Sequence, residues 1–406
     1  METRQIDLFQ TDSAGKRTLR SFSLAERDRR YAQVRKLMGE RDLECLLVPA
    51  TDAGEAQANS RYLSQVGGVQ GGAWVVFPAA GEATAIVSAE REWRMWTANL
   101  IWPKDLRWGN FSQLVPDRVK ELGLQGGRIG VVGLVDQYMR PEGVILHETW
   151  RRIMAALTQA KFVPANDVLE FSRVLKGPEE IEVIQRIADA NEDAIAKMME
   201  VSRAGVEEGT VWIEMAKVLI SHTADYPARL SLGSNGRTAN ASNTMGLPIR
   251  MEDGGVMSQE IDARLQGYRA QSNHSILTGT KNAEQYRAAM GIAIETYLHL
   301  LDWIKPGKTI GEFLDEFVSF ADRRSAKAGG VIVHTNGLGQ DRPRVGPGPD
   351  VKDRDMVIQP GFTFSIKPQV EMKSTGTRAQ VGDPLTVGEH GARRLGRRKL
   401  EPFVTG

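Results

Sequence analysis

The chain has 406 residues, more than one ordinary domain needs, and 41% of them are apolar, enough for two separate cores. Lysine and arginine number 52 against 51 aspartates and glutamates, so no net charge favours nucleic acid or an anionic membrane surface. No stretch approaches the roughly 18 apolar residues that span a bilayer, and the N-terminal stretch lacks the apolar core of a signal peptide. We therefore expect a soluble cytoplasmic protein whose partner is a small molecule, with no nucleic acid or membrane partner.

Residues 1–170 are predicted to form an α/β domain. Residues 23–40 begin with a serine cap and have the apolar spacing of a helix, and residues 43–50 follow as a buried strand. This strand contains the single cysteine, Cys45, which is expected to be a small buried side chain. The alternation of elements continues with strands at 71–80, 83–89 and 128–134 and a helix around 144–157.

Residues 171–406 are predicted to form a second domain of the α+β class. Gly177-Pro178 followed by two glutamates is a strong helix start, because proline fits the first turn and acidic side chains favour the helix dipole. Two pairs of helices are expected to pack on a mostly antiparallel sheet. The expected helices are 179–204, 209–222, 283–303 and 309–328, with a Gly/Asn/Ser-rich loop at 233–248 and strands after the last helix.

The stretch MSQEIDARLQGYRAQ, residues 257–271, predicts a strand, a tight turn at Gly267-Tyr268 and a returning strand. This arrangement brings Glu260 and Gln271 together on adjacent strands, facing one cavity. Two aspartates at these positions would suggest a metal site, whereas a glutamate and a glutamine do not. The pair therefore marks a pocket lined by hydrogen-bonding groups.

The order of elements, with VLKGPEEIEVIQRIADANEDAI opening the second domain, resembles the creatinase / aminopeptidase P family over nearly the whole chain. The resemblance implies a C-terminal "pita-bread" domain preceded by a smaller creatinase-type N-terminal α/β domain. It also implies that five positions correspond to the metal ligands of the metallopeptidases in that family. These positions hold Glu260, Gln271, Asn336, Lys367 and Gln380, and the family's proton-shuttling histidine corresponds to Asn243.

This set of one carboxylate, three amides and one ammonium is a poor donor set for divalent metals, because lysine repels a cation. We therefore expect no metal and no other cofactor. Glu260 and Lys367 are interpreted as a catalytic base and acid, since burial and a neighbouring charge tune both pKa values. A purely structural buried salt bridge is the competing interpretation.

Two histidines are further candidates for acid/base catalysis. His334 precedes Asn336 by two residues and so shares its face of a strand, and His274 faces the pocket only if a bulge interrupts its strand. In the N-terminal domain, Trp93 and Trp96 belong to a tryptophan-rich segment that either packs in the core or forms a wall for a ligand. The family resemblance implies a homodimer in which this domain approaches the partner's active site.

The sequence thus predicts a metal-independent, creatinase-like enzyme, a hydrolase or lyase that cleaves a C–N, C–O or C–C bond in a small polar or aromatic metabolite. Asn243, Gln271, Asn336 and Gln380 are expected to orient the substrate. The alternative is a pita-bread protein that has lost catalysis and binds a metabolite or protein partner. The near-zero net charge and the lack of an acidic tail argue against a histone-chaperone role.

Overall fold

The computed structural model describes residues 9–11, 15, 17–19, 21–50, 57–67, 72–135, 142–237, 248–330, 332–339, 341–347 and 353–405. Asn243, one of the predicted substrate-binding residues, lies outside these ranges. Apart from a short segment near residue 338, the chain divides into two compact units that meet in sequence at Glu179 and Glu180. The sequence analysis placed this boundary at residues 170 and 171. Each unit is described by itself.

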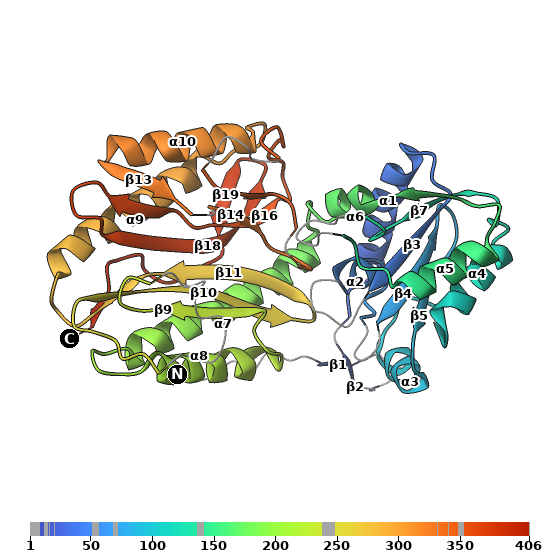
Figure 1. Cartoon of the computed structure of the whole chain (residues 1–406), viewed down its shortest axis with the longest axis horizontal. Helices are drawn as coiled ribbons and strands as arrows, with labels where there is room; N and C mark the ends of the chain where they lie inside the picture. Colours follow the sequence, from blue (N-terminus) through green and yellow to red (C-terminus); the bar gives the residue numbers. More distant parts are fainter. Residues whose placement is uncertain are drawn as a thin grey trace. The chain divides into compact units, whose positions relative to one another are not determined.

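The N-terminal domain contains a six-stranded mixed sheet in the order β6-β5-β4-β3-β7-β8, within the described part of the chain (Figure 1). Its strands are β3 (Cys45–Ala50), β4 (Ala73–Pro78), β5 (Thr84–Val87), β6 (Asp105–Trp108), β7 (Arg128–Val131) and β8 (Lys161–Pro164). Its helices are α1 (Leu24–Gly39), α2 (Ala58–Ser64), α3 (Glu90–Asn99), α4 (Phe111–Glu121), α5 (His147–Ala156) and α6 (Asn166–Ser172). A separate hairpin consists of β1 (Phe9–Thr11) and β2 (Arg17–Leu19).

Helices cover both faces of this sheet. On one face, Cys45 and Val76 of the strands pack against Val119 of α4 and Ile153 of α5. On the other face, the ring of Tyr31 in α1 packs edge-on against Phe77, with centroids 4.8 Å apart. The predicted serine cap is confirmed, because Ser23 accepts a hydrogen bond from the backbone of Glu26 at the start of α1. The alternating strand and helix pattern predicted for this domain is correct.

The C-terminal domain is built on a twelve-stranded sheet in the described residues, and every pairing is antiparallel except that of β12 with β20. The central path runs β15-β14-β16-β18-β11-β10-β12-β20, with β9 beside β10 and β13, β17 and β19 joining through β18. The strands are β9 (Arg229–Gly233), β10 (Gly255–Leu265), β11 (Tyr268–His274), β12 (Ile276–Thr278), β13 (Ala326–Gly329), β14 (Val333–Thr335), β15 (Arg344–Val345), β16 (Thr363–Ile366), β17 (Gln369–Met372), β18 (Arg378–Gly388), β19 (Gly391–Arg394) and β20 (Val404–Thr405).

Two helix pairs pack on this sheet, as the sequence predicts (Figure 1). They are α7 (Pro178–Val201) with α8 (Glu208–Thr223), and α9 (Ala283–Trp303) with α10 (Ile310–Arg323). Asn191 of α7 donates a hydrogen bond to the carbonyl of Ala270 in β11, and Tyr286 of α9 donates one to the carbonyl of Ser275. The fourth helix was predicted to reach residue 328. It ends at Arg323 because Ser325 adopts a left-handed conformation and β13 begins at Ala326.

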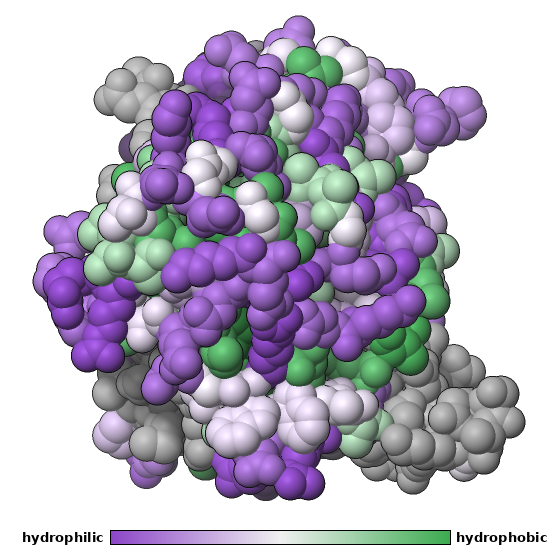
Figure 2. All heavy atoms as spheres, turned by 90° about the vertical axis from the view of Figure 1, so that its right-hand side faces the viewer, coloured by the Kyte–Doolittle hydropathy of each residue, from purple (hydrophilic) through white to green (hydrophobic). Residues whose placement is uncertain are grey.

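The surface seen from the side of α4 and α5 is mostly hydrophilic, with smaller hydrophobic areas between the polar side chains (Figure 2). Exposed large hydrophobic residues of this domain include Leu146, with 72% of its surface exposed, and Trp108, with 48%. Among the described residues, no helix has the length and apolar character required to cross a membrane.

Candidate active site

The β10–β11 hairpin places the candidate side chains on one face of the sheet. Asp262 lies directly opposite Gln271 in the antiparallel register. Because side chains alternate along a strand, Glu260 shares the face of Asp262, and Asn273 shares the face of Gln271. The predicted proximity of Glu260 and Gln271 on adjacent strands is therefore present in the structure. We call this the catalytic face of the hairpin.

The hairpin closes through a two-residue turn. Leu265 pairs with Tyr268, and the two residues between them, Gln266 and Gly267, have φ values of 53° and 86°. Two consecutive positive φ angles match the twist of the flanking strands and favour glycine at the second position. The turn fixes the strand register, so it determines which side chains lie beside Glu260.

Glu260 is held between two cations. Lys367, which directly follows β16, donates a hydrogen bond from Nζ to Glu260 Oε1 at 2.7 Å. Arg229 of β9 places Nε 2.9 Å from Glu260 Oε2. Lys367 is almost completely buried and Glu260 is 9% exposed. The two residues that sequence analysis assigned as base and acid are therefore in direct contact.

This contact shifts both pKa values. Burial raises the pKa of Glu260, but the charge and hydrogen bond of Lys367, with the charges of Arg229 and Arg269, outweigh it, so the net pKa is lowered. Burial lowers the pKa of Lys367, and its interaction with Glu260 only partly offsets this effect. At neutral pH Glu260 is thus a carboxylate, and the ammonium of Lys367 releases its proton more readily than that of an exposed lysine.

A second buried ion pair lies beside the first. Asp262 forms a salt bridge with Arg269 of β11, and both side chains are at least nine-tenths buried. The charge of Asp262 also raises the pKa of Lys367. Sequence analysis missed Arg229, Asp262 and Arg269. The alternation of Glu260 and Asp262 along one strand was a signal that could have identified the aspartate.

The amides of Gln271 and Asn336 are buried next to each other. The Gln271 backbone N–H donates to Asn336 Oδ1 at 3.4 Å, and Ser365 Oγ lies 3.1 Å from the same oxygen. Within the described residues, both terminal atoms of the Gln271 side chain and the Nδ2 atom of Asn336 are buried without a hydrogen-bond partner. Such groups are costly unless a ligand or water satisfies them.

Gln380 lies at the margin of this face. Its Nε2 atom donates to the Lys367 carbonyl at 3.1 Å, and its Oε1 atom lies 3.5 Å from Nδ2 of Asn273. Gln380 therefore contacts the backbone of the candidate acid. All five residues that the sequence resemblance places at the family's metal-ligand positions form hydrogen bonds among themselves, namely Glu260 with Lys367, Gln271 with Asn336 and Gln380 with the Lys367 backbone.

His334 lies near the same charges. It is opposite Ser365 in the pairing of β14 with β16 and is 4% exposed. Burial, followed by the positive charges of Lys367 and Arg269, lowers its pKa well below the ordinary histidine value. His334 is therefore neutral at physiological pH. It is close enough to Lys367 to respond to its charge, as a pocket-lining residue would.

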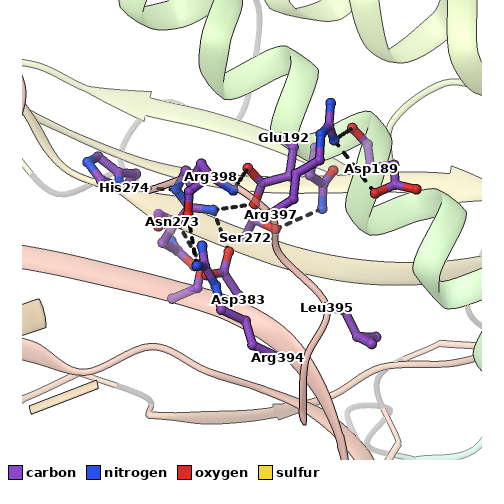
Figure 3. Close-up of polar contacts among 12 residues, drawn as sticks. Asp189, Glu192, Ser272, Asn273, His274, Asp383, Arg394, Leu395, Arg397 and Arg398 are labelled. Carbon is purple, nitrogen blue, oxygen red and sulfur yellow. Dashed lines mark hydrogen bonds and ion pairs between the residues drawn. The ribbon is translucent and has the colours of Figure 1, made fainter. Parts of the chain in front are cut away.

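His274 lies on the opposite face of β11, and no bulge turns it toward Glu260. Its Nδ1 atom accepts a hydrogen bond from Arg398 Nε at 3.1 Å, and its Nε2 atom is 3.1 Å from the carbonyl of Glu401 (Figure 3). Burial, with the charge of Arg398, lowers the pKa of His274 to about 3. The structure therefore does not bring His274 to the catalytic face.

Arg398 is the centre of this second polar group, which we call the Arg398 cluster and define as Glu192, His274, Asp383, Arg394 and Arg398. Its guanidinium contacts Glu192 of α7, Asp383 of β18 and the carbonyl of Asn273 (Figure 3). These contacts tie the C-terminal segment to the helix side of the sheet.

Trp93 and Trp96 are on α3 of the N-terminal domain. Trp93 is half-buried and donates from Nε1 to the carbonyl of Leu106 at 2.8 Å, and Trp96 is 7% exposed. Both tryptophans therefore contribute to the packing of their own domain. Their predicted contact with a ligand stays a prediction.

The residues that the sequence resemblance places at the family's metal positions do not fit a pair of divalent cations. Carboxylates and imidazoles hold such metals, whereas here a buried ammonium is hydrogen-bonded to the single carboxylate of the set. Among the described residues, no group of three or more histidines, cysteines, aspartates or glutamates has an arrangement suited to a metal. We derive no chemical step through a metal.

The fold and the sequence define the class of this protein. Residues 182–390 match the model of metallopeptidase family M24, and residues 30–175 match the creatinase/prolidase N-terminal domain. The chain belongs to the M24 family, with the pita-bread fold of the creatinase / aminopeptidase P proteins and a creatinase-type N-terminal domain.

Known relatives are distant. An Xaa-Pro dipeptidase of Pyrococcus furiosus is 22% identical over 265 residues, which cover 64% of this chain and 74% of that protein. An ectoine hydrolase of Halomonas elongata is 22% identical over 309 residues, which cover 72% of each chain. These relatives are hydrolases by name, which supports a hydrolase-type enzyme in general.

Solved structures of low sequence identity share the fold. A prolidase from Pyrococcus horikoshii superimposes with a TM-score of 0.73 at 18% identity, covering 91% of this chain and 99% of that one. An X-Pro aminopeptidase from Thermotoga maritima gives a TM-score of 0.74 at 17% identity, covering 92% of this chain and 100% of that one. At these identities the comparison establishes architecture only.

Proposed function

We propose that this protein is a metal-independent hydrolase that cleaves a C–N bond of a small polar molecule, with Glu260 as base and Lys367 as acid. The observation that supports this most strongly is the 2.7 Å contact between Lys367 Nζ and Glu260 Oε1 on the catalytic face. Within the family, an ammonium here replaces a ligand of the metal that otherwise activates water. In this proposal Glu260 accepts a proton from the water molecule, and Lys367 donates one to the leaving group.

The proposed reaction uses one water molecule. Glu260 takes a proton from water, and the hydroxide oxygen forms a bond to the substrate carbon. The C–N bond then breaks, and the leaving nitrogen takes a proton from Lys367. The direct hydrogen bond between the two side chains lets the proton on Glu260 return to Lys367, which restores the starting state. Each proton transfer of this kind contributes typically 10²–10⁴-fold to the rate.

The lowered pKa values support these assignments in part. A lysine whose pKa is lowered by burial is a better acid near neutral pH than an exposed one. Glu260 is ionised, as a base must be, but its lowered pKa also makes it a weaker base. Binding of a substrate that displaces Arg229 from Glu260 Oε2 would restore basicity.

The pairing of both carboxylate oxygens of Glu260 with cations supports a second candidate function. A carboxylate held by both Lys367 and Arg229 resembles a structural salt bridge, and a pita-bread protein without catalysis would bind a metabolite or a protein partner. The two candidates differ in whether substitution of Lys367 reduces turnover or only stability.

The test is a screen of small amides, ureides and amidines with metal-stripped protein in ¹⁸O-labelled water, followed by mass spectrometry. A hydrolase incorporates one labelled oxygen into its product, whereas a lyase product carries none. Cleavage without label would replace hydrolysis by elimination. Cleavage that occurs only after a divalent metal is added would overturn the proposed mechanism.

We further propose that the protein acts as a homodimer in the cytoplasm and that its only partner is its small-molecule substrate. The exposed tryptophan and leucine side chains of the N-terminal domain are available for subunit contacts. Sedimentation equilibrium tests the dimer, and a monomer at micromolar concentration would refute it.

A further inference from the structure

The buried amides of the catalytic face select a particular shape of ligand. Asn336 Oδ1 is the oxygen of that amide, because it faces the backbone N–H of Gln271, which only donates. Asn336 Nδ2 is therefore a donor without a partner in the described residues. Gln271 has both a donor and an acceptor without partners, whichever way its amide is oriented. The site thus offers two donors and one acceptor.

The head of a glutamine side chain presents its N–H and its C=O on one edge. It forms two parallel hydrogen bonds only with a group that also carries an acceptor and a donor on a single edge. Lactams, ureides and primary carboxamides have such an edge. A trans peptide bond has its C=O and N–H on opposite sides, and an Xaa-Pro bond has no N–H.

The charges on this face favour a neutral reacting group. Glu260 is paired with Lys367 and Arg229, and Asp262 is paired with Arg269. A carboxylate in place of the amide edge would put an acceptor against Gln271 Oε1 and leave that oxygen without a donor. Sites that hydrogen-bond a specific group reject analogues that lack it, because their own buried groups stay unpaired.

The same domain contains a cavity of about 410 Å³, whose lining includes neither Gln271 nor Asn336. Ser258 in its wall lies two residues before Glu260, so both side chains point to the same side of β10. Gln369, also in its wall, pairs with Gln380. The cavity therefore borders β10 and β18, the strands that carry Glu260 and Gln380.

We propose that Gln271 and Asn336 recognise a substrate with a cis-amide edge, that is, a lactam, ureide or primary carboxamide, and reject trans amides. This inference rests on the proposed function in treating the bound molecule as the substrate. The recognition itself is independent of catalysis. Gln271 pairs with the donor and acceptor of the edge, and Asn336 Nδ2 donates to a further lone pair of its oxygen.

Three probes of similar size and equal charge test this recognition by isothermal titration calorimetry. 5-Oxoproline has a lactam edge, its N-methyl derivative lacks the N–H, and N-acetylglycine has a trans amide. We expect the wild-type protein to bind 5-oxoproline at least tenfold more tightly than either of the others. Equal affinity for all three, or no binding of 5-oxoproline, would overturn the proposal.

Gln271→Glu removes the donor while keeping the shape of the side chain. It should weaken binding of 5-oxoproline at least tenfold and reduce the preference over the N-methyl derivative. Gln359→Glu makes the same chemical change at an exposed position and should leave the affinity unchanged. If Gln271→Glu does not fold, Asn336→Ala is used, and the wild-type comparison of probes decides the matter in either case.

The outcome also separates this inference from the proposed function. Preferential binding of 5-oxoproline by a protein that cleaves no compound in the screen would support the recognition and refute the hydrolase. Cleavage confined to substrates without a cis-amide edge would refute the recognition and support the hydrolase.

Discussion

The two faces of the β10–β11 hairpin use similar side chains for different purposes. On the helix side, Arg398 contacts Glu192, Asp383, His274 and the Asn273 carbonyl, so this buried cation has partners around its whole guanidinium. On the catalytic face, the terminal atoms of Gln271 have none among the described residues. Within the Arg398 cluster, Arg394 Nη2 alone lacks a partner among the described residues, whereas both ends of the Gln271 amide lack one, as in a group that awaits a ligand.

Net charge distinguishes the faces less well than hydrogen bonding does. Both contain buried carboxylates beside buried cations, and both shift the pKa of a histidine downward, that of His274 and that of His334. Perturbed pKa values alone would therefore suggest two functional sites. The buried amides of Gln271 and Asn336, which have side-chain atoms without partners among the described residues, occur on the catalytic face and identify it as the candidate site.

The largest expected effect is on the helix side. Arg398→Met leaves Glu192 and Asp383 buried beside each other with less compensating charge, and loss of one partner of a buried pair costs about 3–5 kcal/mol. Chemical denaturation measures this change in the free energy of unfolding. Arg397→Met is the matched control, because half of that side chain is exposed, and it should cost less than about 1 kcal/mol. Equal losses in the free energy of unfolding for the two variants would contradict a special stabilising role of the Arg398 cluster.

On the catalytic face, the same kind of change should affect turnover. Glu260→Gln and Lys367→Met are each expected to lower kcat at least about a hundredfold if the pair transfers protons. Steady-state kinetics on a substrate found in the screen gives this value, and thermal denaturation shows whether the variants are folded.

The structural alternative has its own signature. If Glu260 and Lys367 only form a salt bridge, each single variant loses about 3–5 kcal/mol and the double variant regains much of it. Folded single variants that retain wild-type turnover would end the catalytic assignment.

Local patterns predicted most of the elements near the site. Gly177-Pro178 located the start of α7, and the spacing of Glu260, Gly267 and Gln271 located the hairpin. The predicted turn at Gly267-Tyr268 is wrong by one residue, because the turn residues are Gln266 and Gly267 and Tyr268 begins β11. These features depend on turn and cap chemistry within about fifteen residues. The contact between Glu260 and Lys367 is separated by 107 residues, and only the family resemblance allowed the two to be linked.

The omissions have physical reasons. Arg229 belongs to β9, a five-residue strand next to a polar loop, and its pairing with β10 is not visible in local periodicity. α4 contains Pro116, a residue that normally argues against a helix interior. His274 follows strict strand alternation, so it faces the helices, and the bulge that would have turned it toward the pocket is absent from the described β11.

The pH dependence of activity should reflect Glu260 and Lys367 and not the histidines. The lowered pKa of Lys367 places the basic limb of kcat/KM below the ordinary lysine value of about 10.4, and the lowered pKa of Glu260 places the acidic limb below about 4.3. The pKa values of His274 and His334 are both lowered, so both side chains are neutral near pH 7.

We therefore expect kcat/KM to show no inflection near pH 6.5, the ordinary pKa of histidine. Glu260 also makes the stability of the protein depend on pH, because its carboxyl pKa is lower in the folded state than in the unfolded state. Its stabilising contribution is fully present above the pKa of the unfolded state and is lost as pH falls through the pKa of the folded state. An inflection in kcat/KM near pH 6.5 would instead assign the acid/base chemistry to a histidine.

The smallest expected effect is that of metal removal. Dialysis against a chelator should leave the activity and the melting temperature unchanged, because an ammonium and neutral amides at the family's metal positions give little affinity for divalent cations. Elemental analysis of the purified protein checks the same point, and near one zinc, manganese, cobalt or iron per chain bound at these residues would contradict it.

The converse experiment introduces metal-binding side chains at these positions. The combination of Gln271→Asp, Asn336→His, Lys367→Glu and Gln380→Glu replaces this set with carboxylates and an imidazole, and it crowds negative charge around Glu260. That variant should melt at a lower temperature than the wild type and recover on addition of Mn²⁺, since a bound cation would then compensate the charges that Lys367 and Arg229 compensate in the natural protein.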